Sequence, residues 1–409
     1  MTWEWASSGK GGDRDPSLSR GTTQSGVRLY NERLVLSLIR LHGQLPKAEM
    51  ARLTGLSAQT VSVIVRQLEA DGLLKRRTPQ RGKVGQPLVP FELDPEGAFT
   101  IGLKVGRRSG DLMLMDLAGN VRRTIHKPYM FPSPAELLDF VRSGVEELTS
   151  ELSVRQRSRI SGLGIAAPFE LWKWEDEVGA PRDILMAWKD YDLAAEIGRL
   201  FEWPVLFCND ASAACAAELL FGQGRDIRDF AYFYMGYFIG GGIVLNGSLF
   251  LGTNGNAGAL GSFPVTSVTG KSEELIRTAS FYVLEREIRR RGGDAEALWR
   301  DPTDWSGFGD VMDEWVETAA RGIATAAAGV MAVIDCSAVV IDGAMPIDLR
   351  SRLTRAVRSA LDEVNLQGIS SFAVREGSVG ADARAMGAAS LPLFDNFIIN
   401  RNLLFKEQN

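Results

Sequence analysis

The amphipathic stretch of residues 57–71 constrains the fold of this chain more than any other segment. Ser57 supplies a side-chain oxygen that can cap the first N–H groups of a helix. The apolar residues after it recur at the helical period of 3.6 residues: Val61, Ile64, Val65 and Leu68. Lys47–Thr54 has a shorter helical pattern, and Gly55-Leu56 separates the two segments. This arrangement predicts a helix-turn-helix, whose second helix enters the DNA major groove, with an ordinary helical hairpin as the alternative.

A basic hairpin is predicted directly after this helix pair. Leu73–Arg77 and Leu88–Leu93 have strand patterns, and residues 80–87 between them include two glycines. From Arg28 to Pro90 the chain holds eleven Lys and Arg against four Asp and Glu, although the whole chain has a formal net charge of −5. A basic module on an acidic remainder indicates phosphate binding confined to one domain, although many charge runs are only solvated surface. We therefore predict a winged helix-turn-helix domain over residues 27–93.

Length and composition exclude several classes of protein. The 409 residues fit two or three domains, and no run of about 18 uncharged apolar residues indicates a membrane span. Residues 1–26 lack the pattern of a secretory signal and are expected to form a disordered tail. Three widely spaced cysteines and two histidines suggest neither a disulfide framework nor a zinc site. We expect a cytoplasmic protein with no membrane partner, no cofactor and no bound metal.

The rest of the chain predicts an α/β fold with two lobes. Three strands over residues 99–128 precede a helix over 134–152 and a buried strand over 161–168. A second set of strands and helices follows, with helices expected over 271–292 and 310–335. Ligands in such folds bind beyond the carboxyl ends of strands, which places the ligand site in the cleft between the lobes. The expected lobes are 94–208 and 209–382, with a C-terminal helical segment over 383–409 that returns to the first lobe.

Six short motifs occur along the chain: Gly162–Pro168, Cys208–Glu218, Met235–Ile243, Asn246-Gly247, Ala257-Gly258 and Gly380–Gly387. In this order and spacing they resemble the ROK family (repressors, open reading frames and sugar kinases), and in particular its repressor branch. The resemblance covers roughly residues 27–393. It implies a winged helix-turn-helix followed by a two-lobed actin-like sugar-kinase fold of the ribonuclease H-like kind.

Two departures from the family pattern argue against kinase activity. Lys104 stands where the resemblance implies an Asp that handles Mg-ATP, and an ammonium group cannot replace an oxygen ligand of Mg²⁺. The second phosphate loop reads Gly236-Tyr237-Phe238, with bulky side chains where the backbone should approach phosphate. Asp210 matches the family's catalytic base, but a base without a phosphoryl donor site has no reaction to drive. We therefore expect no catalytic residues and no enzyme activity.

The sugar-contacting and zinc-binding groups implied by the resemblance are also missing. The family Glu and His correspond to Ala259 and Ser262, and the cysteine segment corresponds to Lys271–Ser280, which has no cysteine. Ile276 stands near the position of another sugar-contacting Glu. A site built for ligand hydroxyls depends on such partners, so the ligand is an atypical sugar, a non-sugar, or absent.

Four residues of the expected cleft are the candidates for effector binding: Asn209, Asp210, Asn256 and Gly258. The Asn209-Asp210 pair follows a predicted strand at the cleft, where it can bind a ligand hydroxyl. Alternatively, Asp210 caps the helix predicted over residues 211–221. Both roles are compatible.

The DNA-binding candidates divide by their chemistry. Gln59, Thr60, Ser62 and Arg66, after the cap residue Ser57, are expected to contact base edges, since Gln pairs with adenine and Arg with guanine. The expected phosphate contacts are Lys75, Arg76, Arg77, Arg81 and Lys83. Gln86, at the tip of the wing, is expected to enter the minor groove, as the resemblance implies.

The leading hypothesis is a DNA-binding transcriptional regulator of carbohydrate-related genes, a repressor that acts as a homodimer or homotetramer. Its expected partners are a double-stranded operator and a small-molecule effector, a sugar or a sugar derivative. Two other hypotheses remain open: an active sugar kinase with an accessory DNA-binding module, and a DNA-bound scaffold that needs no effector.

Overall fold

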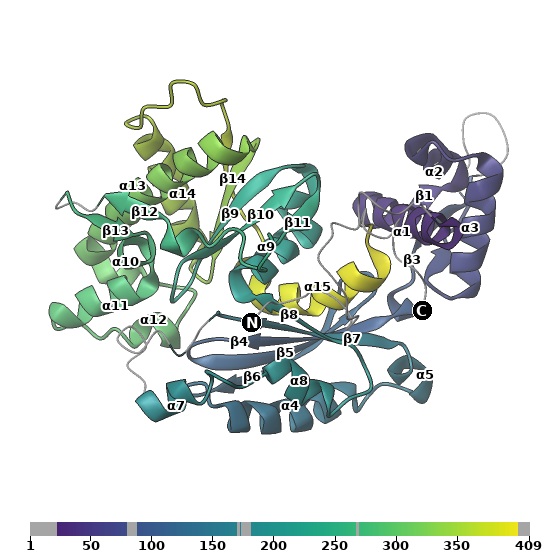
Figure 1. Ribbon diagram of the computed structural model, residues 1–409, viewed down its shortest axis with the longest axis horizontal. Coiled ribbons are helices and arrows are strands. Elements are labelled where there is room, and N and C mark those ends of the chain that lie inside the picture. The colour runs from purple at the N-terminus through teal and green to yellow at the C-terminus, as the bar shows by residue number, and fades with distance from the viewer. Residues whose placement is uncertain (1–22, 80–87, 170–171, 173–180, 267–269, 400–409) are drawn as a thin grey trace.

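The computed structural model describes residues 23–79, 88–169, 172, 181–266 and 270–399 (Figure 1). Most of the predicted N-terminal tail, residues 1–22, lies outside the described residues, as do 400–409 of the predicted C-terminal segment. Residues 24–26 of the predicted tail belong to the first helix instead.

The N-terminal module is the predicted winged helix-turn-helix. Its elements are α1 (Gln24–His42), β1 (Leu45–Pro46), α2 (Lys47–Thr54), α3 (Ala58–Ala70), β2 (Leu74–Arg76) and β3 (Pro90–Leu93). The strands form one sheet in the order β1-β3-β2. The turn between α2 and α3 depends on Gly55, whose φ of 71° is a left-handed conformation that disfavours a side chain. The predicted apolar stripe of α3 is buried against α1, α2 and the sheet, which confirms the amphipathic pattern.

The first lobe is built on a five-stranded sheet in the order β6-β5-β4-β7-β8. Its strands are β4 (Phe99–Val105), β5 (Ser109–Asp116), β6 (Val121–Pro128), β7 (Ile160–Ala167) and β8 (Val205–Asn209). Its helices are α4 (Pro134–Thr149), α5 (Val154–Arg157), α7 (Arg182–Met186) and α8 (Leu193–Gly198). The first three strands are antiparallel, whereas β7 and β8 run parallel to β4 and bring their carboxyl ends to the cleft.

The second lobe repeats this arrangement in the order β11-β10-β9-β14-β15. Its strands are β9 (Phe230–Met235), β10 (Gly240–Leu245), β11 (Ser248–Phe250), β14 (Ala338–Gly343) and β15 (Ala373–Glu376). A small sheet pairs β12 (Pro264–Thr266) with β13 (Ser272–Glu274). Its helices are α9 (Asp210–Phe221), α10 (Ile276–Ala279), α11 (Phe281–Arg290), α12 (Ala297–Arg300), α13 (Gly309–Ile334) and α14 (Ile347–Leu361).

The single helix predicted over residues 271–292 is wrong. Ser272–Glu274 pairs with Pro264–Thr266 as a strand, and the helical part is divided between α10 and α11. Pairing with β12, the strand just before it in the chain, outweighs the local helical spacing.

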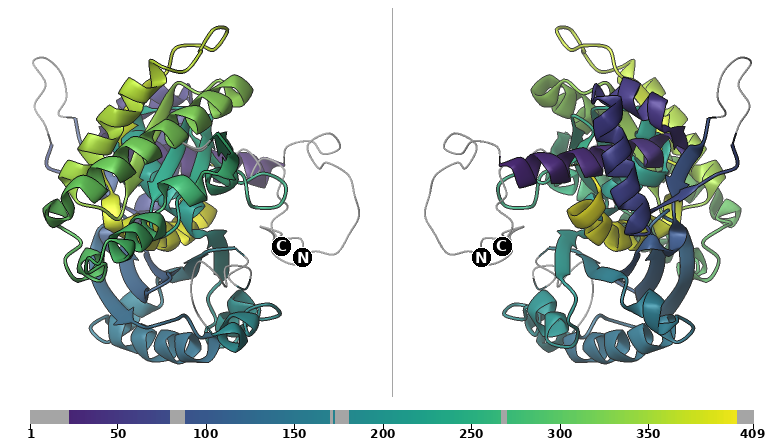
Figure 2. Two further views of the ribbon diagram at one scale, coloured as in Figure 1. Left: turned by 90° about the vertical axis from the view of Figure 1, so that its left-hand side faces the viewer. Right: turned by 90° about the vertical axis from the view of Figure 1, so that its right-hand side faces the viewer.

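The helix α15 (Ala383–Phe397) lies between the two lobes, where Figures 1 and 2 show it in yellow. It packs on β4 and β7 of the first sheet and on α9 of the second lobe. Glycines permit this close approach, because a Cβ added at Gly164 would lie 1.9 Å from the carbonyl oxygen of Ala388. The last turn of α15 reaches the winged helix, where Phe397 packs against its core.

The three larger sheets take their strands from residues 45–93, 99–209 and 230–376. These limits favour the predicted domains 27–93, 94–208 and 209–382, which we retain as a proposal.

One helical segment, Ser306–Ile334, is long and apolar enough to cross a membrane, with a mean hydropathy of 1.2. Its side chains pack in the core of the second lobe against α10 and α14, which accounts for its apolar composition.

Candidate DNA-binding surface and effector pocket

The second helix of the helix-turn-helix, α3, lies at the outer edge of the N-terminal module, away from the two lobes (Figure 1). The Ser57 hydroxyl accepts the backbone N–H of Thr60 at 3.1 Å, which confirms the predicted N-cap. Gln59 and Arg66 are exposed on the face opposite the buried stripe. Arg66 forms no ion pair with any residue that the structure describes, so its guanidinium remains free to bind an acceptor.

Two of the predicted base-contacting residues are partly engaged inside the module. Ser62 accepts a hydrogen bond from the Lys47 ammonium at 3.4 Å, and Thr60 contacts Ser57 at 2.8 Å. Sequence reasoning missed Val63, whose side chain is 59% exposed on the same face as Gln59 and Arg66. An exposed apolar residue that lies off the buried stripe was the available signal, because such a side chain can contact the methyl group of thymine.

The predicted phosphate-binding cations of β2 face carboxylates. Glu92 on β3 accepts Lys75 at 3.3 Å and Arg77 at 2.6 Å, and Arg76 pairs with Glu69 of α3. The positive charge at the base of the wing is therefore partly balanced before any DNA binds. Arg81, Lys83 and Gln86 lie outside the described residues.

A pocket of about 220 Å³ opens between the two lobes. All four predicted effector residues line it: Asn209, Asp210, Asn256 and Gly258. Gly258 also has a packing role, because its φ is 81° and an added Cβ would lie 2.7 Å from Gly242. Sequence reasoning missed Arg107, Tyr234 and Arg384 in this pocket. They lie far apart in the chain, and no local pattern brings them together.

Asn209 and Asp210 have different roles in the structure, one as a helix cap and the other in an ion pair. Asn209 is the N-cap of α9, and its side-chain oxygen accepts the N–H groups of Ala211 at 3.0 Å and Ser212 at 3.3 Å. The alternative in which Asp210 caps this helix is therefore wrong, because Asp210 is its first residue. The Asp210 carboxylate instead accepts a hydrogen bond from Arg384 of α15 at 3.2 Å.

Lys104 is the centre of a buried polar cluster behind the pocket. Its ammonium donates to Asp111 at 2.7 Å and to Ser109 at 2.8 Å, and His126 contacts the other oxygen of Asp111. Burial lowers the pKa of Lys104 to about 8, with Arg384 acting in the same direction and Asp111 opposing it. Lys104 thus pairs with the Asp111 carboxylate, and Asp210 also acts on its charge.

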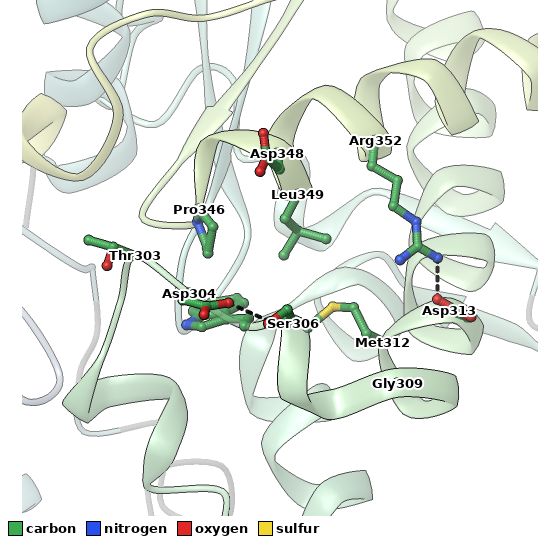
Figure 3. Close-up of a pocket in the computed structure, with 11 residues that line it drawn as sticks. Thr303, Asp304, Ser306, Gly309, Met312, Asp313, Pro346, Asp348, Leu349 and Arg352 are labelled. Atoms are coloured by element: carbon green, nitrogen blue, oxygen red, sulfur yellow. Dashed lines mark hydrogen bonds and ion pairs between the residues drawn. The ribbon is translucent and has the colours of Figure 1, made fainter.

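Another pocket, of about 240 Å³, lies between α13, α14 and the segment before α13 (Figure 3). Arg352 pairs with Asp313 across it, and the Ser306 N–H donates to Asp304 at 2.9 Å. None of the residues predicted from the sequence lines this pocket. The four predicted effector-binding residues therefore lie together in the pocket between the lobes.

Comparisons with known proteins agree with this architecture. Residues 100–279 match the model of the ROK family, and residues 30–83 match that of the MarR family, over the helix-turn-helix. The chain carries a ROK family domain behind a MarR-like helix-turn-helix. Both expectations drawn from the resemblance, the family and the fold class, are thereby confirmed.

Similar proteins include regulators and kinases. An uncharacterised protein, y4fQ, from Sinorhizobium fredii is 24% identical and covers 90% of this chain and 91% of its own. The xylose repressor of Bacillus subtilis is 24% identical over 59% of this chain and 62% of its own length. The Escherichia coli regulator NagC is 23% identical over 58% of each chain. This chain thus matches less than two thirds of the length of the xylose repressor and of NagC.

Solved structures share the fold. A ROK family transcriptional regulator described as a homologue of the E. coli MLC protein has a TM-score of 0.65 at 19% identity and covers 93% of this chain and 100% of its own. A ROK family glucokinase from Streptomyces griseus has a TM-score of 0.56 at 20% identity, with 72% of this chain and 99% of its own covered. The regulator thus covers the N-terminal module as well as the ROK domain, whereas the kinase covers a smaller share of the chain.

Proposed function

We propose that this protein is a DNA-binding transcriptional repressor of carbohydrate-related genes whose ROK domain binds a small-molecule effector in the cleft. The exposed face of α3, with Gln59 and Arg66 outermost, carries this proposal. It belongs to the second helix of a helix-turn-helix, the element that reads base edges. The name of the xylose repressor supports repression, and the name of NagC, a DNA-binding transcriptional dual regulator, supports transcription regulation more generally.

The proposed coupling joins the cleft to the operator. The effector binds around Asn209, Asp210, Asn256 and Gly258, and lobe closure changes the spacing of two winged helices in a homodimer or homotetramer. An effector acts on DNA affinity only through a difference in its affinity for the two forms, which is the coupling free energy.

We also propose that the ROK domain is catalytically inactive. The salt bridge between Lys104 and Asp111 supports this inference, because it occupies the position where the resemblance implies a carboxylate for Mg-ATP. The bulky Tyr237 and Phe238 in the second phosphate loop support it too. Robust ATP turnover on any hexose would instead support a sugar kinase with an accessory DNA-binding module.

The function is tested by the affinity of the full chain for a specific duplex recovered from a randomised pool. Arg66→Ala should weaken specific binding by about 1–3 kcal/mol, the value of one bidentate contact to guanine, and leave weak non-specific binding. Arg28→Ala is the matched control, because Arg28 is an exposed arginine of the same module that pairs with Glu32 on α1. Equal losses in the two variants, or unchanged specific affinity in Arg66→Ala, would contradict the proposed reading surface.

A further inference from the structure

The pocket between the lobes carries an excess of positive charge. Among the described residues that line it, Arg107 and Arg384 are cations and Asp210 is the one carboxylate. Asp210 is already engaged by Arg384 at 3.2 Å. Carboxylates outside the lining also act on these cations, Glu285 on Arg107 and Asp111 on Arg384, so the charge excess belongs to the lining alone.

Arg384 retains unused hydrogen-bonding capacity. It lies in the first turn of α15, its side chain is 16% exposed, and a single nitrogen, Nη1, contacts Asp210. Its Nε is buried and makes no hydrogen bond to any described residue. A guanidinium offers five donors in a planar fork, and oxyanions bind two of them in parallel. Arg384 can thus hold a second oxyanion beside Asp210.

A second buried donor lies next to Arg384. The Tyr234 side chain is 2% exposed and lines the same pocket, and its ring lies 5.1 Å from the Arg384 guanidinium carbon. The Arg384 guanidinium lies close enough to the Tyr234 hydroxyl to lower its pKa, and no described residue accepts a hydrogen bond from this hydroxyl. Burial raises the pKa of Tyr234 to about 12, so this hydroxyl stays protonated and can donate to a ligand oxygen at neutral pH.

Aromatic side chains form part of the pocket wall. The rings of Tyr237 and Phe238 lie 4.9 Å apart and both line the pocket. Arg107 lies over the rings of Phe131 and Tyr237, at 4.6 and 5.6 Å from their centroids. The pocket volume of about 220 Å³ lies below the ~300–1,000 Å³ of typical pockets for drug-sized ligands, so we expect a ligand of about monosaccharide size.

We propose that the cleft binds an anionic molecule of monosaccharide size, whose oxyanion contacts Arg384 and the Tyr234 hydroxyl and whose body packs on Tyr237 and Phe238. This inference rests on the proposed function, because it names the chemical class of the effector. Carboxylates and phosphates share the required chemistry, so sugar acids and sugar phosphates are the two sources that the experiment distinguishes.

The charge of Asp210 separates this proposal from binding of a neutral sugar. The Asp210 carboxylate repels an anionic ligand that Arg384 holds beside it, so Asp210→Asn should strengthen the binding of that ligand by several-fold. A neutral sugar would instead donate a hydroxyl hydrogen to the Asp210 carboxylate, and the same substitution would weaken its binding. The two ligand classes thus predict effects of opposite sign.

The experiment uses calorimetric titration and thermal-shift measurements on the full chain. The probes are hexuronic and aldonic acids, hexose phosphates and the parent neutral hexoses. Either the sugar acids or the hexose phosphates should bind. Arg384→Gln and Tyr234→Phe should each weaken that binding about tenfold or more, as expected for the loss of a hydrogen bond to a charged group. Arg352→Gln is the matched control, since Arg352 lines the other pocket, where it pairs with Asp313.

Three results would overturn the proposal. They are binding of a neutral hexose that Asp210→Asn weakens, anion binding that survives both Arg384→Gln and Tyr234→Phe, and no response of the wild-type protein to any anionic probe. Tyr234→Phe keeps the buried ring, so the proposal stays testable if Arg384→Gln does not fold. Duplex DNA binding is measured on the same preparations, because its absence would refute the proposed function while leaving the ligand result intact.

Discussion

Individual charges in the winged helix are arranged so that carboxylates hold the cations at the base of the wing. Glu92 contacts both Lys75 and Arg77, and its side chain is 15% exposed. A cation that must leave such a partner before it binds phosphate contributes less to DNA affinity than a free one. We therefore expect Glu92 to lower the general affinity for DNA and to leave a larger share of the binding energy to the proposed base contacts of α3.

Glu92→Gln should raise non-specific affinity for duplex DNA and steepen its dependence on salt concentration. If Lys75 and Arg77 each gain a phosphate contact, the slope of log K against log salt should steepen by about 1–2. Fluorescence anisotropy over a series of salt concentrations measures this slope. Glu317→Gln on α13 is the control, because it makes the same change in net charge and breaks a similar pair with Arg321 far from the wing. The same slope in both variants would count against a regulatory role of Glu92.

The buried ammonium of Lys104 should make stability depend on pH in the alkaline range. Its pKa is lowered from 10.5 to about 8 by burial, so below pH 8 the folded and unfolded chains both carry the proton and the cost of burying the charge is fully present. Between about pH 8 and 10.5 the unfolded chain binds more protons, and this group's contribution to the free energy of unfolding rises with pH.

Lys104→Met should remove that rise, which is on the order of 3 kcal/mol at most. Urea unfolding of both proteins at several pH values between about 7 and 10 gives the difference in the free energy of unfolding. The wild-type protein should gain stability relative to the variant as the pH rises. Parallel curves would show that Lys104 does not titrate in this range.

Among the helices and strands, the sequence predicted correctly those whose caps and turns are encoded by neighbouring residues. The helix Lys47–Thr54 has the predicted bounds, and α3 follows its predicted cap, because the glycine turn and the Ser57 cap are both local. The strand β1 was missed, since two residues that include a proline become a strand only by pairing with β3. In the pocket, only the lining residues that belong to the sequence motifs were predicted. Arg107, Tyr234 and Arg384 were missed because they come together only through tertiary packing.

The helix α15 connects the pocket to the DNA-binding module. Arg384 in its first turn lines the pocket, while Phe397 at its end packs against the winged-helix core. Just beyond the helix, the Ile399 N–H donates to the Ser37 hydroxyl of α1 at 3.0 Å. We infer that a helix with one end at each candidate site is an element whose position ligands at both sites can bias.

Phe397→Ala should loosen the contact between the winged helix and the ROK domain. The lost packing should cost about 3 kcal/mol or less, because Phe397 is only partly buried. In differential scanning calorimetry the winged helix and the ROK domain of the wild-type protein should unfold in one transition. In the variant, the winged helix should unfold alone at a lower temperature. Phe250→Ala, on the exposed edge strand β11, is the control. A single unshifted transition in Phe397→Ala would indicate that α15 does not join the two parts.

In the molecule as a whole, the two lobes are held together by ion pairs as well as by α15. Arg108, between β4 and β5 of the first lobe, contacts Glu285 at 3.3 Å and Glu296 at 2.7 Å in the second lobe. Glu285 is buried and also accepts the indole N–H of Trp299 at 2.9 Å. These contacts lie at the junction between the lobes, where closure around a ligand would change them. The winged helix, the two lobes and the pocket between them are thus joined by direct contacts.

The central claim, that this chain is a sequence-specific DNA-binding regulator, is tested most directly by selecting duplexes from a randomised pool with the full chain. The account predicts enrichment of one motif, present as two half-sites because the protein is proposed to act as a homo-oligomer. Binding to the enriched duplex should weaken steeply with rising salt concentration and should require Arg66. Failure to enrich any motif, together with no affinity for duplex DNA at low salt concentration, would contradict the account.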